Sequence, residues 1–185
     1  MYFHNQKLIL RPWEESDAQS LFRYASDPDV GPIAGWPPHQ SVEQSLDVIR
    51  HVFNGDECYA ICKRNSHEAI GAIELKLNGH TDMTERDDEC ELGYWLAKPY
   101  WGQGYMTEAL RAMVQYGFER KGLDVLAIGH FKENSRSRRV IEKCGFHYEG
   151  TCPRLFSALT ARSLTMCAIP SCGRIIFLSG AVQNP

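Results

Sequence analysis

The stretch GYWLAKPYWGQGYMT, residues 93–107, constrains the fold of this 185-residue chain more than any other part of its sequence. Strand-forming residues run into Pro99, glycines follow at Gly102 and Gly104, and helical spacing of apolar residues begins directly afterwards. A strand that passes through a glycine turn into a helix leaves backbone N–H groups available to an anion. The pattern therefore predicts an α/β fold with a phosphate site at this turn.

The familiar phosphate-binding motifs do not match this turn. A P-loop needs Lys after its last glycine, and no Lys follows Gly104. A dinucleotide-binding fingerprint needs a third glycine where this chain has Thr107. A tight turn or helix cap without any ligand is the alternative that the turn alone leaves open.

The rest of the chain alternates between strand and helix patterns, without repeats or linkers. Residues 27–41 hold four prolines and two glycines, which predicts a loop without regular structure, and Ser41 is expected to cap the helix that follows. We expect one domain over residues 1–170 with a mixed sheet, and cannot assign a structure to the tail, residues 171–185. The expected strands are 8–13, 57–63, 69–79, 90–97, 124–131, 146–152 and 162–169, and the expected helices are 14–27, 41–53, 105–122 and 134–145.

Composition excludes several classes of protein. The net charge of −3 provides no basic surface for nucleic acid or anionic membrane, and no signal peptide or long apolar run occurs, so we expect a cytoplasmic protein. The seven cysteines form no C-x-x-C pair or zinc-ligand spacing, which predicts small buried side chains and no metal. Six of the seven histidines are scattered singly and are expected at the surface or in loops.

Three segments in register resemble the GNAT superfamily of N-acetyltransferases, and within it the RimJ/RimL-like branch. They read LILRPWEESDAQSLF, ECELGYWLAKPYWGQGYMTEAL and NSRSRRVIEKCGFHYEG, and the resemblance spans about residues 7–169. It implies a mostly antiparallel sheet flanked by helices, with one parallel strand pair that splays apart. It also implies a monomeric or homodimeric acetyl-CoA-dependent enzyme that acts on an amine, needs no metal and binds neither nucleic acid nor membrane.

The resemblance also implies which residues hold acetyl-CoA. The family's pyrophosphate loop, Q/R-x-x-G-x-G/A, lies on residues 101–106, where Trp101 and Met106 depart from the pattern and Met106 is expected to crowd the backbone. Arg136, Arg138 and Arg139 are candidates for the adenosine phosphates, or form a solvated helix face. The implied coenzyme-binding residues are Gly93, Tyr94, Trp95, Leu96, Trp101, Gly102, Gln103, Gly104, Tyr105, Met106, Thr107, Asn134 and Ser137.

Catalysis needs a general base for the amine and a proton donor for the leaving thiolate. Glu91 matches the family's E-x-G-Y-W glutamate and is the expected base, acting through water, with Glu74 as the second candidate. A strand carboxylate that faces solvent or pairs with an Arg is the alternative for either. Ser137 matches the Ser of the family's N-x-x-S motif and is the expected acid, with Tyr148 as its alternative. An amide near Leu96 is expected to donate to the oxyanion.

The acceptor side is expected at the loop between the first two helices. Tyr24, Trp36 and His39 are the candidates there, with a proline-stiffened loop and a packed Trp36 as the alternative. The acceptor is a protein N-terminus or, alternatively, a polyamine or antibiotic, for which the acidic stretch TDMTERDDECE offers an entrance. A module that binds acyl-CoA without turnover is the alternative to an enzyme.

Overall fold

The computed structural model describes residues 3–4, 7–77, 84, 86–153 and 163–170, so the tail beyond Pro170 lies outside it. Within these residues one sheet has the strand order β1-β2-β3-β4-β5-β6-β8-β7. β5 and β6 run parallel and the other neighbouring strands run antiparallel, which confirms the expected mixed sheet. The strands are β1 (Phe3–His4), β2 (Leu8–Pro12), β3 (Cys58–Lys63), β4 (Ala69–Leu77), β5 (Glu89–Leu96), β6 (Val125–Phe131), β7 (His147–Pro153) and β8 (Ser163–Pro170).

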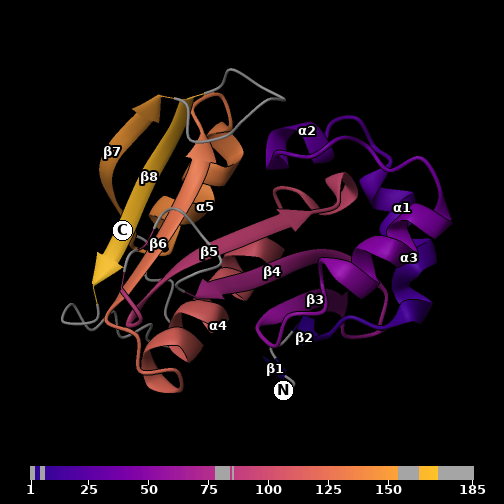
Figure 1. Cartoon of the computed structure of the whole chain (residues 1–185), viewed down its shortest axis with the longest axis horizontal. Coiled ribbons are helices and arrows are strands. Elements are labelled where there is room, and N and C mark those ends of the chain that lie inside the picture. The colour runs from indigo at the N-terminus through magenta and orange to yellow at the C-terminus, as the bar shows by residue number, and fades with distance from the viewer. Residues whose placement is uncertain (1–2, 5–6, 78–83, 85, 154–162, 171–185) are drawn as a thin grey trace, which may run out of the picture.

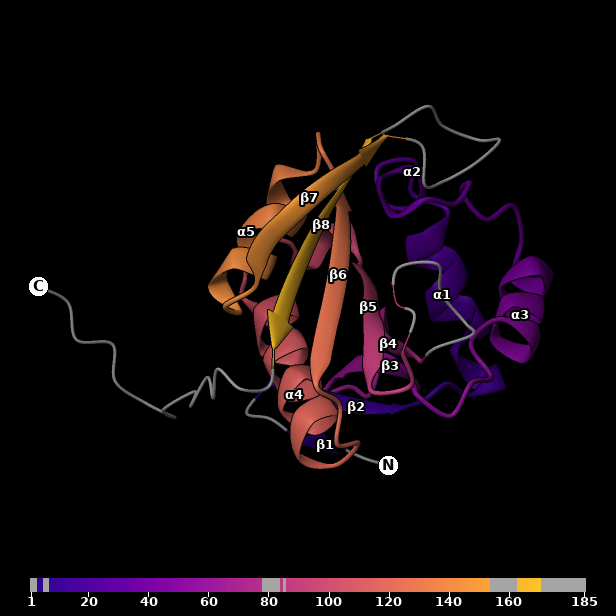
Figure 2. The same cartoon turned by 60° about the vertical axis from the view of Figure 1, so that its left-hand side comes forward.

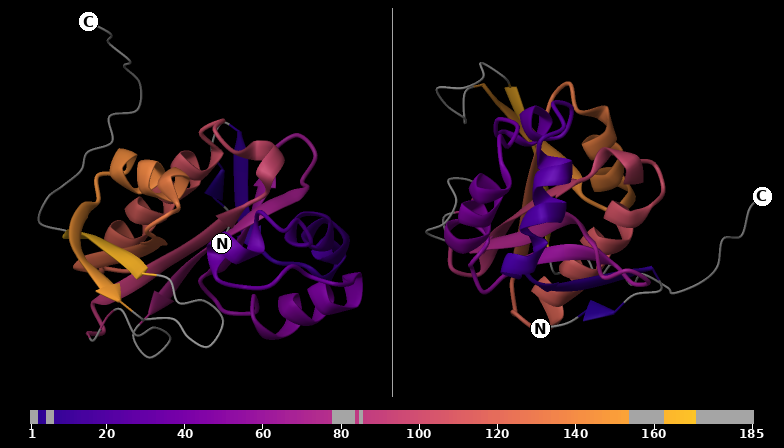
Figure 3. Two further views of the ribbon diagram at one scale, coloured as in Figure 1. Left: turned by 90° about the horizontal axis from the view of Figure 1, so that it is seen from above. Right: turned by 90° about the vertical axis from the view of Figure 1, so that its right-hand side faces the viewer.

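Helices cover both faces of the sheet (Figure 1, Figure 3). α4 and α5 lie on one face, and α1 and α3 lie on the other. Within the described residues α4, with 15 residues, is the longest helix, and no helix has the length and apolarity needed to cross a membrane. The helices are α1 (Ala18–Ala25), α2 (Gly31–Ala34), α3 (Val42–His51), α4 (Tyr105–Glu119) and α5 (Ser135–Lys143).

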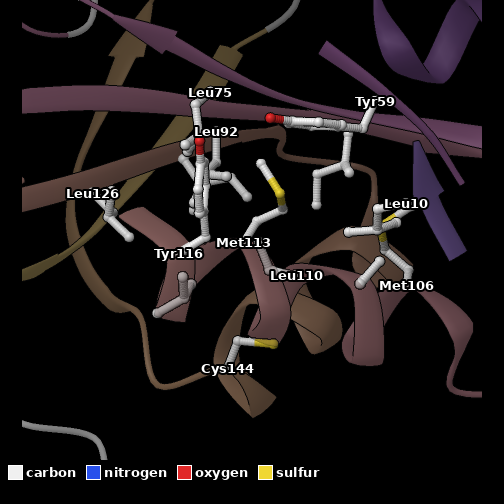
Figure 4. Packing of buried hydrophobic residues seen from close by; sticks show 14 of the residues in the cluster. Leu10, Tyr59, Leu75, Leu92, Met106, Leu110, Met113, Tyr116, Leu126 and Cys144 are labelled. Atoms are coloured by element: carbon white, nitrogen blue, oxygen red, sulfur yellow. The ribbon is translucent and has the colours of Figure 1, made fainter. Parts of the chain in front are cut away.

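Two hydrophobic cores hold these layers together, one on each face. Figure 4 shows Leu110 and Met113 of α4 packed against Leu92 of β5 in the first core. The second core joins Leu21 of α1 to Trp95 of β5. Because successive side chains of a strand point to opposite faces, β5 contributes to both cores and is buried at the centre of the molecule.

The cysteines behave as the sequence predicts. The five whose side chains the structure describes are buried: Cys58, Cys62, Cys90, Cys144 and Cys167. Burial raises the pKa of the Cys62 and Cys90 thiols to about 12, so both are protonated at neutral pH. They act as small apolar side chains in the two cores.

The prediction that residues 27–41 contain no regular structure is wrong, because α2 forms within them. Pro32 lies in the first turn of α2, where its missing N–H removes no helical hydrogen bond. Gly35 ends the helix with a φ of 98°, a left-handed conformation that suits glycine. The predicted cap is confirmed at the next helix, where the Ser41 side chain accepts a hydrogen bond from the Gln44 amide at 3.1 Å.

The parallel strands β5 and β6 pair over only half their length. Their register runs from Glu89 opposite Val125 to Leu92 opposite Ile128 and then ends. Beyond that point the two strands diverge, and α2 lies beside the opening (Figure 1, Figure 2). The splayed pair that the family resemblance implies is therefore present, and it opens the middle of the sheet.

Candidate active site

A cavity of about 780 Å³ occupies the opening between β5 and β6. Its walls come from α4 and α5 on one face of the sheet and from α2 on the other. Of the thirteen residues predicted to hold the coenzyme, Gln103 alone does not line this cavity. The structure brings together the remaining twelve: Gly93, Tyr94, Trp95, Leu96, Trp101, Gly102, Gly104, Tyr105, Met106, Thr107, Asn134 and Ser137.

The glycine turn forms one end of the cavity. Gly102 and Gly104 have φ angles of 74° and 83°, which L side chains rarely adopt, and a Cβ atom on either would meet nothing within 4 Å. The first helical hydrogen bond is donated by Glu108 to the Gly104 carbonyl at 3.0 Å. The amides of the preceding residues, Tyr105 to Thr107, therefore have no acceptor within the helix and can bind an anion.

Met106 does not crowd this turn as the sequence suggested. Its side chain is 5% exposed and belongs to the first core, close to Leu10 (Figure 4). The side chain therefore points away from the amides, and the departure from Gly or Ala leaves the turn open.

Trp101 locks the turn onto the end of β5. Its indole Nε1 donates a hydrogen bond of 2.7 Å to the Leu96 carbonyl, and the Arg136 guanidinium lies 4.7 Å from the centre of its ring. The Gln103 side chain turns back to the Pro99 carbonyl at 2.7 Å, which keeps it out of the cavity.

The basic residues of α5 divide into two groups. Arg136 and Arg139 line the cavity, together with Lys143 one turn further along the helix. Arg138 instead pairs with Glu142 at 2.7 Å and is not among the described lining residues. The cavity side of α5 is therefore electropositive, as binding of phosphate groups requires.

Asn134 and Ser137 are positioned by the start of α5. The Asn134 side chain caps the helix by accepting a hydrogen bond of 3.1 Å from the Ser137 amide, and its Nδ2 donates to the Ile33 carbonyl of α2 at 3.4 Å. The Ser137 hydroxyl lies 2.7 Å from the Tyr94 hydroxyl. Burial raises the pKa of Tyr94, so its phenol is protonated at neutral pH.

Glu91 lies on the opposite side of the sheet opening and is paired with a cation. The residue is 8% exposed, and its Oε1 is 3.2 Å from Nζ of Lys76, its direct neighbour across the β4–β5 ladder. Both residues line the cavity. The sequence allowed for pairing with an Arg, and the partner found is instead a Lys.

The other predicted acceptor and catalytic residues lie outside the described lining of the cavity. The Tyr24 hydroxyl donates to Glu68 at 2.8 Å, and His39 is buried with its Nδ1 2.8 Å from the Ser45 hydroxyl. Burial lowers the pKa of His39, which favours the neutral ring.

Trp36 packs edge-on against Trp95, with ring centres 5.8 Å apart. Glu74 pairs across the sheet with Gly93, and Tyr148 is 65% exposed on β7.

Sequence reasoning missed Lys76, Tyr100 and His130, which also line the cavity. His130 is 6% exposed, so its expected surface position is wrong. Alternation with Leu126 and Ile128 on the same strand was the signal that could have placed it on a buried face. Lys76 could be found only from the register of β4 against β5.

No group of three or more His, Cys, Asp or Glu side chains within the described residues could hold a metal ion. The acidic stretch at residues 81–91 is described only in part. Its members Asp87, Asp88 and Glu89 lie at the paired end of β5 and do not belong to the described cavity lining, and Arg86 pairs with Asp88.

Residues 7–147 match the family described as "Acetyltransferase (GNAT) domain". The chain is 42% identical over 149 residues to "Putative ribosomal N-acetyltransferase YdaF" of Bacillus subtilis, covering 79% of this chain and 81% of that protein. A GNAT-family acetyltransferase from Bacillus anthracis has a similar fold, with a TM-score of 0.80, 21% identity and coverage of 92% and 99% of the two chains.

A ribosomal-protein-S5-alanine acetyltransferase from Vibrio fischeri superposes with a TM-score of 0.68 and 19% identity, over 92% of this chain and 97% of that one. The family match and the YdaF relative each cover well over two thirds of this chain. The splayed strands, the glycine turn, Glu91 and Ser137 line one cavity in this fold. The chain therefore belongs to the GNAT family of N-acetyltransferases and resembles its RimJ/RimL-like branch.

Proposed function

We propose that this enzyme transfers the acetyl group of acetyl-CoA to the α-amine of a protein or peptide N-terminus, by direct attack in a ternary complex. The observation that carries the proposal is the course of the cavity, which joins the glycine turn to Glu91 through the gap between β5 and β6. A thioester entering from one face and an amine entering from the other would meet inside the sheet.

The coenzyme end of the cavity suits a long, phosphate-bearing molecule. The amides of Tyr105, Met106 and Thr107 would hold the pyrophosphate, and Arg139 and Lys143 lie nearby to meet the phosphates. Ala97 donates to Ile70 of β4, so by alternation the main-chain groups of Tyr94 and Leu96 face the gap that β6 leaves. The Tyr94 amide and carbonyl would bond to the pantetheine arm as an added strand does, because Trp101 already donates to the Leu96 carbonyl and the Leu96 amide is kept for the oxyanion.

The catalytic groups would act at the centre of the opening. Glu91 would take a proton from the acceptor amine through a water molecule. The ion pair with Lys76 holds its side chain in the cavity wall, where the amine would arrive. The Leu96 amide would donate to the oxyanion that forms when the amine attacks the thioester carbon. Ser137 would donate a proton to the departing sulfur, supported by the Tyr94 hydroxyl.

Two observations favour a protein or peptide N-terminus over a polyamine as the acceptor. YdaF, the 42% identical relative, carries a name that refers to the ribosome. Glu91 is the sole acidic residue among the described lining residues, and it is paired with Lys76. A polyamine site would instead gather carboxylates.

Steady-state acetylation of a panel of amines tests the proposal. The panel holds peptides with a free N-terminal Ala or Ser, an N-terminally blocked peptide with one Lys, spermidine and an aminoglycoside. We expect a kcat/KM for the free N-termini at least about tenfold above that for each other amine, because an α-amine is far more often neutral at pH 7. Preferential acetylation of spermidine or the aminoglycoside would contradict the proposed acceptor.

A further inference from the structure

Lys76 is the cation that balances Glu91, and the fold holds it there. The two residues face each other directly in the β4–β5 ladder, with Nζ and Oε1 3.2 Å apart. The Lys76 side chain lies across Gly93, where an added Cβ atom would be in van der Waals contact with its Cε at 3.4 Å.

The pair sits in a wall of the cavity and is largely withdrawn from water. The Lys76 side chain is 30% exposed and that of Glu91 is 10% exposed. An ion pair in such a place interacts more strongly than one in bulk solvent, because less water screens it. An incoming amine therefore meets a carboxylate whose charge is already compensated.

We propose that Lys76 determines acceptor specificity by compensating the charge of Glu91, so that the site takes a neutral α-amine and rejects cationic amines. This inference rests on the proposed function, in which Glu91 is the base. An α-amine has a pKa near 7.8, so about 14% is neutral at pH 7, whereas a lysine-type amine with a pKa near 10.4 is only about 0.04% neutral. A cation approaching Glu91 would also meet the Lys76 charge.

The test measures kcat/KM for an Ala-initiated peptide and for spermidine in the wild-type protein and in Lys76→Met. Met keeps most of the apolar stem over Gly93 and removes the charge. We expect the spermidine-to-peptide ratio to rise about tenfold or more.

Two matched variants separate specificity from general effects. Lys76→Arg keeps the charge and should hold the ratio within about twofold of wild type. Lys121→Met breaks another lysine–glutamate pair, that with Glu57 at 2.7 Å, outside the described cavity lining, and should leave the ratio unchanged. A melting-temperature rise with acetyl-CoA checks that each variant is folded, and Lys76→Gln replaces Lys76→Met if the latter does not fold.

The outcomes distinguish this inference from the function on which it rests. If the wild-type enzyme acetylates the peptide and Lys76→Met has the same spermidine-to-peptide ratio as wild type, the role of Lys76 alone is overturned. A wild-type enzyme that prefers spermidine overturns both the role of Lys76 and the proposed acceptor. An enzyme that acetylates neither amine overturns the proposed function itself.

Discussion

The hydroxyl oxygen of Tyr94 lies 2.7 Å from the hydroxyl oxygen of Ser137, and the two side chains reach this position from β5 and α5. Burial raises the pKa of Tyr94, so the phenol keeps its proton and can donate it in this hydrogen bond. When Tyr94 donates, the Ser137 proton is directed elsewhere, and both residues line the cavity. Tyr94 would then orient the acid without itself giving up a proton.

Replacing Tyr94 with Phe should lower kcat by roughly fivefold, because it removes one neutral hydrogen bond that contributes about 1 kcal/mol. Because the phenol acts through Ser137, the double variant Tyr94→Phe, Ser137→Ala should be no slower than Ser137→Ala alone. A double-mutant cycle on kcat measures this coupling. Multiplication of the two single effects would show that Tyr94 acts independently of Ser137.

Sequence reasoning reached the turn and both flanking elements because the information there is local. Gly102 and Gly104 are needed for positive φ angles, and the helix that follows has regular apolar spacing. The Lys76–Glu91 pair could not be predicted from the sequence, because the two residues are fifteen positions apart and meet only through the register of β4 and β5. The insertion of β8 between β6 and β7 is likewise a long-range pairing.

The acceptor loop shows a second limit of sequence reasoning. A His beside Trp and two prolines was interpreted as an exposed acceptor site, yet His39 is buried against Ser45. The same loop contains α2, which lines the cavity through Ile33 and Ala34, and the residues that flank the helix, Val30 and Gly35, line it too. These apolar residues of the loop therefore face the site, and His39 packs inward.

Replacing Gly104 with Val should abolish acetyl-CoA binding. The branched side chain would fill the space left beside the amides at the start of α4, where we place the pyrophosphate. Gly122 provides a matched control, because its φ of 69° and open surroundings impose the same backbone strain outside the described cavity lining. Both valine variants should lose about 1–2 kcal/mol of stability.

The readout for this pair is the rise in melting temperature that acetyl-CoA produces, since a ligand that binds only the folded state stabilises it. Gly122→Val should keep the rise and Gly104→Val should lose it. Equal rises in the two variants would exclude the turn as the pyrophosphate site.

Replacing Arg139 with Ala should weaken acetyl-CoA binding roughly tenfold, since a charge-assisted hydrogen bond contributes about 1.5–3 kcal/mol. Arg138→Ala removes the same charge from the neighbouring position, but Arg138 is engaged by Glu142 outside the described lining. Its effect on the dissociation constant should stay below about twofold. Isothermal titration calorimetry of both variants with acetyl-CoA measures the two dissociation constants. Equal losses of affinity would show that the arginines act only through long-range charge and not through a direct contact of Arg139.

His39 should make folding stability depend on pH. Burial lowers its pKa, so below about pH 6.5 the unfolded chain binds a proton that the folded protein does not. The contribution of the neutral His39 ring to folding stability is complete above the pKa that His39 has in the unfolded chain, and it is lost as the pH falls below that value. The difference in melting temperature between wild type and His39→Gln should therefore become smaller as the pH falls from 7.5 to 5.5. A difference that is constant with pH would contradict the buried neutral ring.

The most direct test of the account is the pH profile of kcat/KM for Glu91→Gln on an N-terminal peptide. A general base typically contributes on the order of 10²–10⁴-fold, so the variant should lose that much while keeping the acetyl-CoA-induced rise in melting temperature. Its acidic limb should also vanish, because that limb reports protonation of the base. Wild-type turnover with an unchanged acidic limb would contradict the account.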